Sequence, residues 1–258
     1  MGKIRPEDPT SFHDIQLLSF DVYSTLIDEK GGLFSGLQPL LSRLPVPNPY
    51  ANDLKYTLHA FQEFEHELQI SRPALQYNKL LQLAYKAFAA SIHLPEPSEE
   101  EAHHFGSLVG AWPAFPDTVA ALKILKKHFR LVILSNIDND SIAATISGPL
   151  KGVEFDAVYT AQDIGSYKPS LSNFKYLLEA VKVDLGVEKE HILHTAQALL
   201  VDHIPAKTMG MHSAWINRED EEETLEKIKG EVAFTWQFES LGEMAAAVEK
   251  EFESAKII

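Results

Sequence analysis

Short apolar runs alternate with helical segments from residue 113 to the end of the chain. This alternation constrains the fold more than any other feature, because strands separated by helices form βαβ units and a parallel sheet. An apolar run at 17–23 adds a first strand, so we expect an α/β fold with a doubly wound parallel sheet. The pattern predicts further strands at 131–134, 155–160, 191–196 and 214–216, and helices at 117–129, 141–146, 172–183, 204–209 and 239–252.

The segment between the first strand and residue 113 has a purely helical pattern. Apolar side chains recur every three or four residues from Leu54 through Phe61 to Leu68, which places them on one face of an amphipathic helix. The segment is far longer than a crossover connection needs. We therefore predict a core domain made of residues 1–29 and 113–258, with an all-helical cap domain inserted at 30–112. We interpret the apolar stripe as the core of that cap.

The composition argues against several classes of partner. The 258 residues carry a formal charge of −14, and an acidic protein repels nucleic acid and anionic membranes. The sequence holds no cysteine, which removes disulfides, thiolate metal sites and cysteine nucleophiles. No apolar stretch reaches about 18 residues, and the first residues have no apolar signal region. We expect a cytoplasmic protein without nucleic-acid or membrane partners.

Polar side chains follow the predicted strands at the places where a ligand would bind. In open parallel sheets, ligands lie beyond the carboxyl ends of the strands. A single acidic residue there is more often a turn or capping residue, but several such groups together indicate an active-site crevice. In chain order these groups are Asp21 with Thr25, Ser135 with Asn136, Lys168, and Gln197 with Asp202.

Four ordered motifs give these residues a family resemblance. Residues 20–26 read FDVYSTL, residues 134–136 read LSN, residues 167–169 read YKP, and Asp202 follows the fourth strand. In this order they resemble the haloacid dehalogenase superfamily, whose cap position matches the helical segment. Within it, the chain is similar to the type II 2-haloacid dehalogenase branch, in a fungal form with Ala-Gln-Ala at 196–198. The resemblance implies a Rossmann-like core and a small anionic organic substrate, and it leaves a homodimer open.

The resemblance also implies covalent catalysis with Asp21 as the nucleophile. Asp21 would displace halide from a short 2-haloacid and form an ester, which water polarised by Asp202 would then hydrolyse. Lys168 would keep Asp21 ionised, because a nearby cation lowers the pKa of a carboxyl group. Thr25 and Ser135 would orient carboxylate oxygens by hydrogen bonding.

Two positions favour this reaction over phosphate-ester hydrolysis. Phosphatases of the superfamily carry a second aspartate two residues after the nucleophile, because an alkoxide leaving group needs a proton; here that residue is Tyr23. They also hold Mg²⁺ with an acidic residue where this chain has Gln197, whose amide carries no charge. We expect no cofactor and no metal site, unless the chain is a phosphatase that uses Mg²⁺. The expected substrate-binding residues are Tyr23, Gln197 and Asn136, the last beside the departing halide.

Two alternatives to a dehalogenase remain open. One is a Mg²⁺-dependent phosphatase acting on a small phosphomonoester, and the other is a non-catalytic relative. They stay open because the arginine that receives halide in the family has no counterpart near residues 59–62, and the tyrosine expected six residues after Lys168 is Phe174. The eleven histidines form no metal-binding motif. We interpret them as surface or hydrogen-bonded side chains, although His203 directly follows Asp202.

Overall fold

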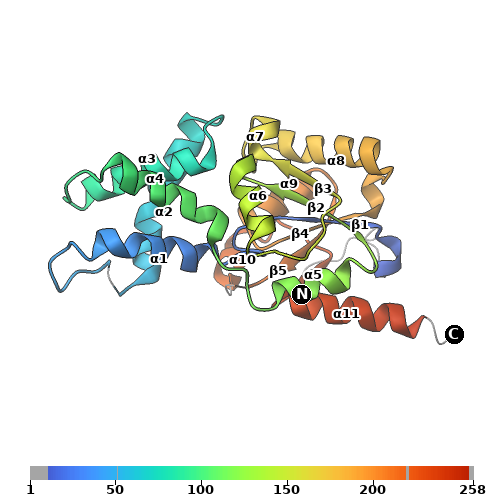
Figure 1. Cartoon of the computed structure of the whole chain (residues 1–258). Coiled ribbons are helices and arrows are strands. Elements are labelled where there is room, and N and C mark those ends of the chain that lie inside the picture. Colours follow the sequence, from blue (N-terminus) through green and yellow to red (C-terminus); the bar gives the residue numbers. More distant parts are fainter. Residues whose placement is uncertain (1–10, 51, 219–220, 256–258) are drawn as a thin grey trace.

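A six-stranded sheet forms the centre of the computed structural model, which describes residues 11–50, 52–218 and 221–255. The strand order is β3-β2-β1-β4-β5-β6, and every neighbouring pair is parallel. Helices cover both faces of the sheet (Figure 1), which confirms the predicted doubly wound α/β fold. The strands are β1 (Leu17–Phe20), β2 (Arg130–Ser135), β3 (Ala157–Thr160), β4 (Ile192–Ala196), β5 (His212–Ile216) and β6 (Trp236–Phe238).

β1 lies in the middle of the sheet, between β2 and β4. All four of its residues are buried, as expected for a parallel strand with helices on both sides. Phe20, the last residue of β1, is level with Ile133 of β2 and Thr195 of β4. The carboxyl ends of these three strands therefore meet at one edge of the sheet, where Asp21 follows β1.

The core helices pack on the two faces of the sheet. In Figure 1, α5 and α11 run along one side and α8 along the other. Apolar side chains of α5 and α11, such as Leu122, Met244 and Val248, belong to one buried cluster. The core helices are α5 (Thr118–Leu125), α6 (Asn139–Ser147), α7 (Ala161–Ile164), α8 (Leu171–Leu185), α9 (Ile204–Thr208), α10 (Glu222–Ile228) and α11 (Leu241–Ser254). Short 3-10 helices are η1 (Phe12–Asp14), η2 (Leu108–Ala111) and η3 (Lys189–His191).

Four helices form a cap that projects beside the sheet in Figure 1. They are α1 (Glu29–Leu41), α2 (Leu54–Ser71), α3 (Tyr77–Ser91) and α4 (Glu99–Ser107). The apolar stripe of α2 faces inward, and the Phe61 ring packs edge-on against Phe88 and Phe105, with ring centroids 5.7 and 5.6 Å apart. The stripe is therefore the core of the cap, as expected. The exact division of the chain at residues 30 and 112 stays a prediction.

Several elements differ from the sequence-based expectation, among them α7 and α10, which were not predicted. β1 ends at Phe20 rather than at residue 23, because the chain turns so sharply that the Val22 carbonyl accepts three backbone N–H groups, from residues 25–27. A π-helix, η4 (Leu199–His203), precedes the helix expected at 204–209. β6 was not predicted, since three residues are too few to show an alternating pattern.

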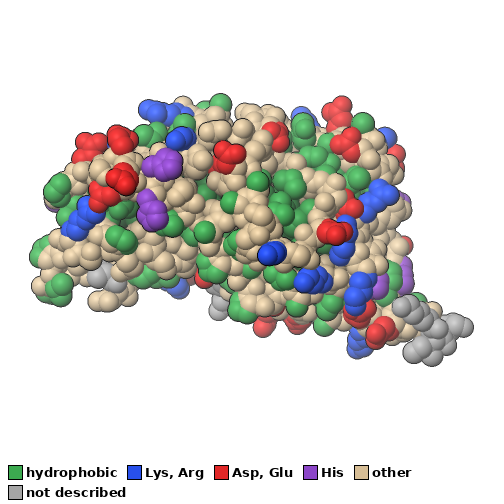
Figure 2. All heavy atoms as spheres, viewed as in Figure 1, with side chains coloured by type: hydrophobic (Ala, Val, Ile, Leu, Met, Phe, Trp, Pro, Cys, Tyr) green, Lys and Arg blue, Asp and Glu red, His purple; other side chains and the backbone are tan. Residues whose placement is uncertain are grey.

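The surface carries charges of both signs. On the face in Figure 2, acidic and basic side chains are interspersed over the core, and acidic side chains gather at the outer end of the cap. Among the described residues, no helix combines the length and the apolar character that a membrane span requires.

Gly32 of α1 lies directly against the indole ring of Trp112, and both residues are buried. A Cβ atom added at Gly32 would lie 2.3 Å from two atoms of that ring. We predict that Gly32→Ala lowers the free energy of unfolding by about 1–3 kcal/mol, because the added methyl group displaces the buried ring of Trp112. Urea denaturation measures the change. Gly230→Ala is the matched control, since a Cβ atom there meets nothing within 4 Å; equal losses in the two variants would contradict the prediction.

Candidate active site

Asp21 opens a tight turn at the carboxyl end of β1 and is 7% exposed. Its backbone N–H donates to the carbonyl of Thr195 on the neighbouring strand, at 3.1 Å. Ser24 takes the left-handed conformation, with φ 67°, as the chain reverses. The Thr25 hydroxyl then donates to Oδ2 of Asp21 at 2.7 Å. The turn thus fixes one oxygen of the carboxylate.

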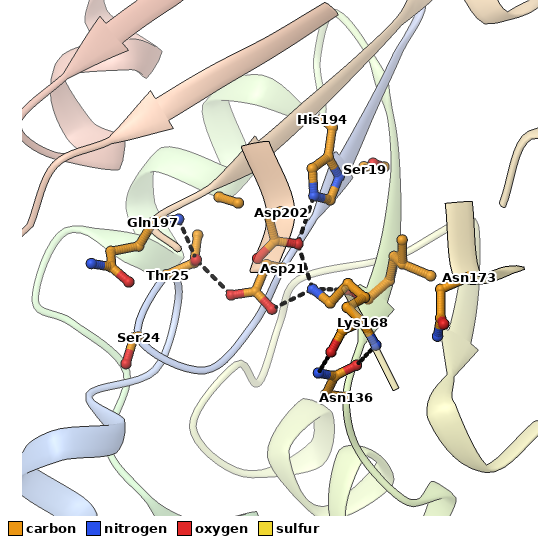
Figure 3. Close-up of polar contacts among 12 residues, drawn as sticks. Ser19, Asp21, Ser24, Thr25, Asn136, Lys168, Asn173, His194, Gln197 and Asp202 are labelled. Atoms are coloured by element: carbon orange, nitrogen blue, oxygen red, sulfur yellow. Dashed lines mark hydrogen bonds and ion pairs between the residues drawn. The ribbon is translucent and has the colours of Figure 1, made fainter. Parts of the chain in front are cut away.

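The Lys168 ammonium lies between two carboxylates, as Figure 3 shows. Its Nζ donates to Oδ1 of Asp21 at 2.8 Å and to Oδ1 of Asp202 at 2.6 Å. A third bond, 3.1 Å long, goes to the backbone carbonyl of Leu134. The lysine is 2% exposed, so the expected contact between Asp21 and Lys168 is present and shielded from water.

Asn136 holds the backbone of Lys168 in place. Its Nδ2 donates to the Lys168 carbonyl at 3.0 Å, and its Oδ1 accepts the Lys168 backbone N–H at 2.6 Å (Figure 3). This pair of bonds links the loop after β2 to the loop that carries the lysine. The amide therefore positions Lys168, and its predicted place beside a halide stays a prediction.

Asp202 lies on the π-helix that follows β4 and is fully buried. Its Oδ1 accepts from Lys168 and also lies 2.9 Å from Nε2 of His194 on β4. On its other side, the His194 ring places Nδ1 2.6 Å from Oγ of Ser19 on β1. Short π-helical segments are frequent at functional sites. Here the π-helix brings the Asp202 carboxylate into contact with His194 of β4.

The two carboxylates share one ammonium unequally. Burial by itself would raise the pKa of Asp202, but Lys168 and the bond to His194 lower it to about 2. Burial raises the pKa of Asp21; Lys168 opposes that rise and the charge of Asp202 adds to it. Lys168 thus lowers the pKa of Asp21 as expected, but burial and the charge of Asp202 outweigh it, so the net shift is upward. Burial disfavours the charged form of Lys168, yet the two carboxylates raise its pKa, so it stays an ammonium.

A second chain of hydrogen bonds supports Asp21 from the side of β4. The backbone N–H of Gln197 donates to the Thr25 hydroxyl at 2.9 Å, and that hydroxyl donates onward to Asp21. The indole N–H of Trp215 donates to the Gln197 carbonyl at 2.9 Å. Gln197 is thus anchored by its backbone, and its side chain lines the cavity in front of Asp21.

Ser135 does not orient Asp21 in this structure, contrary to the expectation. Its hydroxyl is buried and has no hydrogen-bond partner within the described residues. The two oxygens of Asp21 instead accept from Lys168, at Oδ1, and from Thr25, at Oδ2. Ser135 still lines the cavity.

A cavity of about 510 Å³ lies between this edge of the sheet and the cap. Seven of the eight sequence-predicted residues line its core side. The eighth, Thr25, does not line the cavity but is hydrogen-bonded to Asp21. Its cap side includes Gln62, His66 and Gln69, spaced along one face of α2. No arginine is found among the described side chains that line the cavity. Those side chains are Asp21, Tyr23, Ser24, Glu29, Lys30, Gln62, His66, Gln69, Tyr77, Ser135, Asn136, Lys168, Pro169, Gln197, Ala198, Leu200, Val201, Asp202 and Glu221.

Tyr23 lies at the wall of the cavity, with its hydroxyl bonded to a residue of α6. That hydroxyl forms a 3.0 Å hydrogen bond with Thr145, and the ring packs edge-on against Trp112 at 5.7 Å between centroids. Burial raises the pKa of Tyr23 well above its usual range. A phenol this weakly acidic is a poor proton donor to a leaving group.

A row of hydrogen bonds connects the turn after Asp21 to the interior of the cap. The Ser24 hydroxyl donates to Glu29 of α1 at 2.8 Å. The Tyr77 hydroxyl of α3 lies 3.3 Å from Glu29 and 2.8 Å from Glu65 of α2. Burial, together with the charge of Glu29, raises the pKa of Glu65 to about 8. Glu65 is therefore protonated at neutral pH.

The carboxylates at this edge of the sheet are a poor match for Mg²⁺. Both oxygens of Asp21 and Oδ1 of Asp202 accept hydrogen bonds, and one ammonium already serves both groups. Mg²⁺ prefers several anionic oxygens in octahedral geometry, but the third side chain here is the neutral amide of Gln197. Within the described residues, no group of three or more His, Asp or Glu side chains is arranged to hold a metal ion. Of the four carboxylate oxygens of Asp21 and Asp202, only Oδ2 of Asp202 lacks a hydrogen-bond partner within the described residues.

Comparison with known families agrees with this arrangement of motifs. A family model described as haloacid dehalogenase-like hydrolase matches residues 15–195. The chain belongs to the haloacid dehalogenase-like hydrolase family. A comparison with curated protein sequences found no match.

Solved structures similar to this hydrolase share its fold. The L-2-haloacid dehalogenase from Xanthobacter autotrophicus aligns with a TM-score of 0.72 and 19% identity, over 91% of this chain and 98% of that one. The defluorinating L-2-haloacid dehalogenase Rha0230 aligns with a TM-score of 0.73 and 16% identity, over 96% of this chain and 100% of that one. The magnesium-bound HAD-hydrolase YfnB from Bacillus subtilis aligns with a TM-score of 0.71 and 16% identity, over 91% of this chain and 99% of that one. At these identities the likeness shows the fold, a Rossmann-like core with a helical cap.

The sequence analysis missed two buried residues of the hydrolase site, Ser19 and His194. Both are polar side chains inside apolar strands, and they stand directly opposite each other in the β1–β4 register. Facing polar residues on neighbouring buried strands must bond to each other or lose their hydrogen bonds. That pairing is the signal that would have found them. His203 is also buried, but it bonds to the Ala196 carbonyl and to Ser213 and does not line the cavity.

Glu65 should make the stability of this hydrolase fall as pH rises. Its pKa is about 8 in the folded protein and near 4.3 in an unfolded chain, so between these values the folded state binds one more proton. The free energy of unfolding therefore decreases with pH in that window, by at most about 1.4 kcal/mol per pH unit from this group. We predict that Glu65→Gln removes this part of the slope and is more stable than wild type at pH 8. Urea denaturation at pH 5 and pH 8 measures the difference; parallel slopes for the two proteins would contradict it.

Proposed function

We propose that this haloacid dehalogenase-like hydrolase cleaves the carbon–halogen bond of short 2-haloacids through an ester formed on Asp21, without a metal or other cofactor. One observation carries the proposal. Lys168 and Thr25 hold the Asp21 carboxylate at the floor of the cavity. Tyr23, two residues after Asp21, is too weakly acidic to protonate a leaving group. Such a site suits a leaving group that departs as a stable anion, and halide is one.

The first step of the proposed reaction is an in-line displacement. One oxygen of ionised Asp21 attacks the carbon that bears the halogen; the carbon–oxygen bond forms as the carbon–halogen bond breaks, and halide leaves with the electron pair. Thr25 and Lys168 hold the carboxylate in one orientation, which lowers the entropy cost of the attack. The raised pKa of Asp21 means that this step weakens as pH falls and the carboxyl becomes protonated.

The second step of the proposed reaction is ester hydrolysis. Water attacks the carbonyl carbon of the ester and loses a proton to Asp202, and the bond between that carbon and the ester oxygen breaks. The departing oxygen takes a proton and leaves as a 2-hydroxyacid, so Asp21 is restored. Lys168 remains beside both carboxyl groups and stabilises the negative charge that develops on the ester carbonyl.

The cap supplies polar donors for the proposed substrate. The amides of Gln62 and Gln69 and the imidazole of His66 face the cavity from α2, and they are our candidates to receive the substrate carboxylate or the halide. The cavity of about 510 Å³ also has room for acids longer than propionate, since ligand pockets of 300–1,000 Å³ commonly hold larger molecules.

The proposal is tested by measuring halide and phosphate release in parallel, each with and without Mg²⁺. We expect halide release from 2-chloropropionate, 2-bromopropionate or haloacetates that does not depend on Mg²⁺. We predict that Asp21→Ala lowers kcat about a thousandfold or more, because it removes the nucleophile. Asp184→Ala, at an exposed position on α8, is the control that keeps wild-type activity.

Isotope labelling distinguishes the covalent route from direct attack by water. In a single turnover in ¹⁸O-water with enzyme in excess, the product oxygen comes from Asp21, so the label enters the protein and not the hydroxyacid. Label in the first-turnover product would refute the ester. Phosphate release that requires Mg²⁺ would favour the phosphatase, and absence of both activities would favour a non-catalytic relative.

A further inference from the structure

His194 is a buried imidazole that contacts the candidate water-activating group of the site. It is fully buried on β4, with Nε2 2.9 Å from Oδ1 of Asp202 and Nδ1 2.6 Å from Oγ of Ser19. The ring of Phe174 packs edge-on against it at 5.4 Å between centroids. Figure 3 shows the imidazole between Ser19 and Asp202, on the side of Asp202 away from Asp21.

The two partners of His194 fix the orientation of its ring. Asp202 is a carboxylate with a pKa of about 2, so it accepts and does not donate, and Nε2–H must be the donor. On the other side of the ring, Nδ1 lies 2.6 Å from Oγ of Ser19. Ser19 therefore fixes the orientation of the ring, in the way that an outer hydrogen-bond partner orients a reactive side chain.

The two oxygens of Asp202 have different surroundings. Oδ1 accepts from both Lys168 and His194, so rotation of the carboxylate is blocked from two directions. Oδ2 has no hydrogen-bond partner in the described part of the chain, although buried acceptors nearly always have one. Asp202 also lines the cavity in front of Asp21. Oδ2 is thus the oxygen available to take a proton from a molecule that enters.

We propose that His194, set by Ser19, is a positioning residue that holds Asp202 so that Oδ2 receives the proton of the water that hydrolyses the Asp21 ester. This inference rests on the proposed function. It assigns His194 to the second step only, because no hydrogen bond joins the imidazole to Asp21. The first step uses Asp21, Thr25 and Lys168, whose mutual contacts do not involve the ring.

The experiment follows the ester directly. After rapid mixing with 2-bromopropionate and acid quenching, intact-protein mass spectrometry records the fraction of enzyme that carries the carboxyalkyl group. His194→Phe keeps an aromatic ring and removes the donor. We expect the ester to decay about tenfold more slowly or worse, as for loss of a positioned proton acceptor, while it forms at nearly the wild-type rate. Because only the later step slows, kcat and KM should fall together and kcat/KM should stay within about threefold.

Three further variants separate positioning from general damage to the fold. His194→Gln retains an N–H donor and should restore part of the decay rate, and Ser19→Ala should slow decay less than His194→Phe. His203→Gln is the matched control: it alters a second fully buried histidine that bonds to Ala196 and Ser213 instead of Asp202. We expect ester decay in His203→Gln at the wild-type rate.

The outcomes distinguish this inference from the proposed function. If wild-type enzyme forms no ester on Asp21, the proposed function fails, and this inference fails with it. If wild type forms the ester and His194→Phe hydrolyses it at the wild-type rate, only the role of His194 is overturned. Equal slowing in His203→Gln and His194→Phe would also overturn it, because a loss of stability would then explain both. Slower ester formation in His194→Phe would contradict its assignment to the second step.

Discussion

The buried Lys168 ammonium is the interaction on which the rest of the site depends. Removing an ion from water costs several kcal/mol even after the protein relaxes, so the charge persists only where every donor is used. Its three N–H groups are all engaged, by Asp21, by Asp202 and by the Leu134 carbonyl. A lysine has three such donors and no more. The ammonium thus ties together the ends of β1 and β2 and the π-helix after β4.

That arrangement gives two identical side chains different chemistry. Asp202 is the stronger partner of Lys168 and has a further bond from His194, so its pKa falls to about 2. Asp21 keeps a raised pKa under the same cation, and a more basic carboxylate is a better nucleophile. In the proposed reaction, these environments, set by strands far apart in the sequence, suit Asp21 to attack and Asp202 to enter the second step as an anion that accepts the proton of the water.

The amino-acid sequence predicted which residues form the site better than it predicted their contacts. Asp21, Lys168 and Asp202 were identified from their places after strands, and Thr25 from its distance of four residues from Asp21; all four are joined in one network. Ser135 was expected to orient carboxylate oxygens, but its hydroxyl has no partner within the described residues. Ser19 and His194 were missed, since their pairing depends on the register of β1 against β4, which no single strand reveals.

By itself, the sequence determined most of the order of helices and strands, the parallel sheet and the presence of a helical segment after the first strand, because hydrophobic periodicity depends only on near neighbours along the chain. It also determined which chemical groups follow the strands. Only the tertiary structure decided the state of those groups. The raised pKa values of Asp21 and Glu65, the orientation of the His194 ring and the lack of a partner for Oδ2 of Asp202 among the described residues all depend on burial and on distances through space between residues remote in the chain.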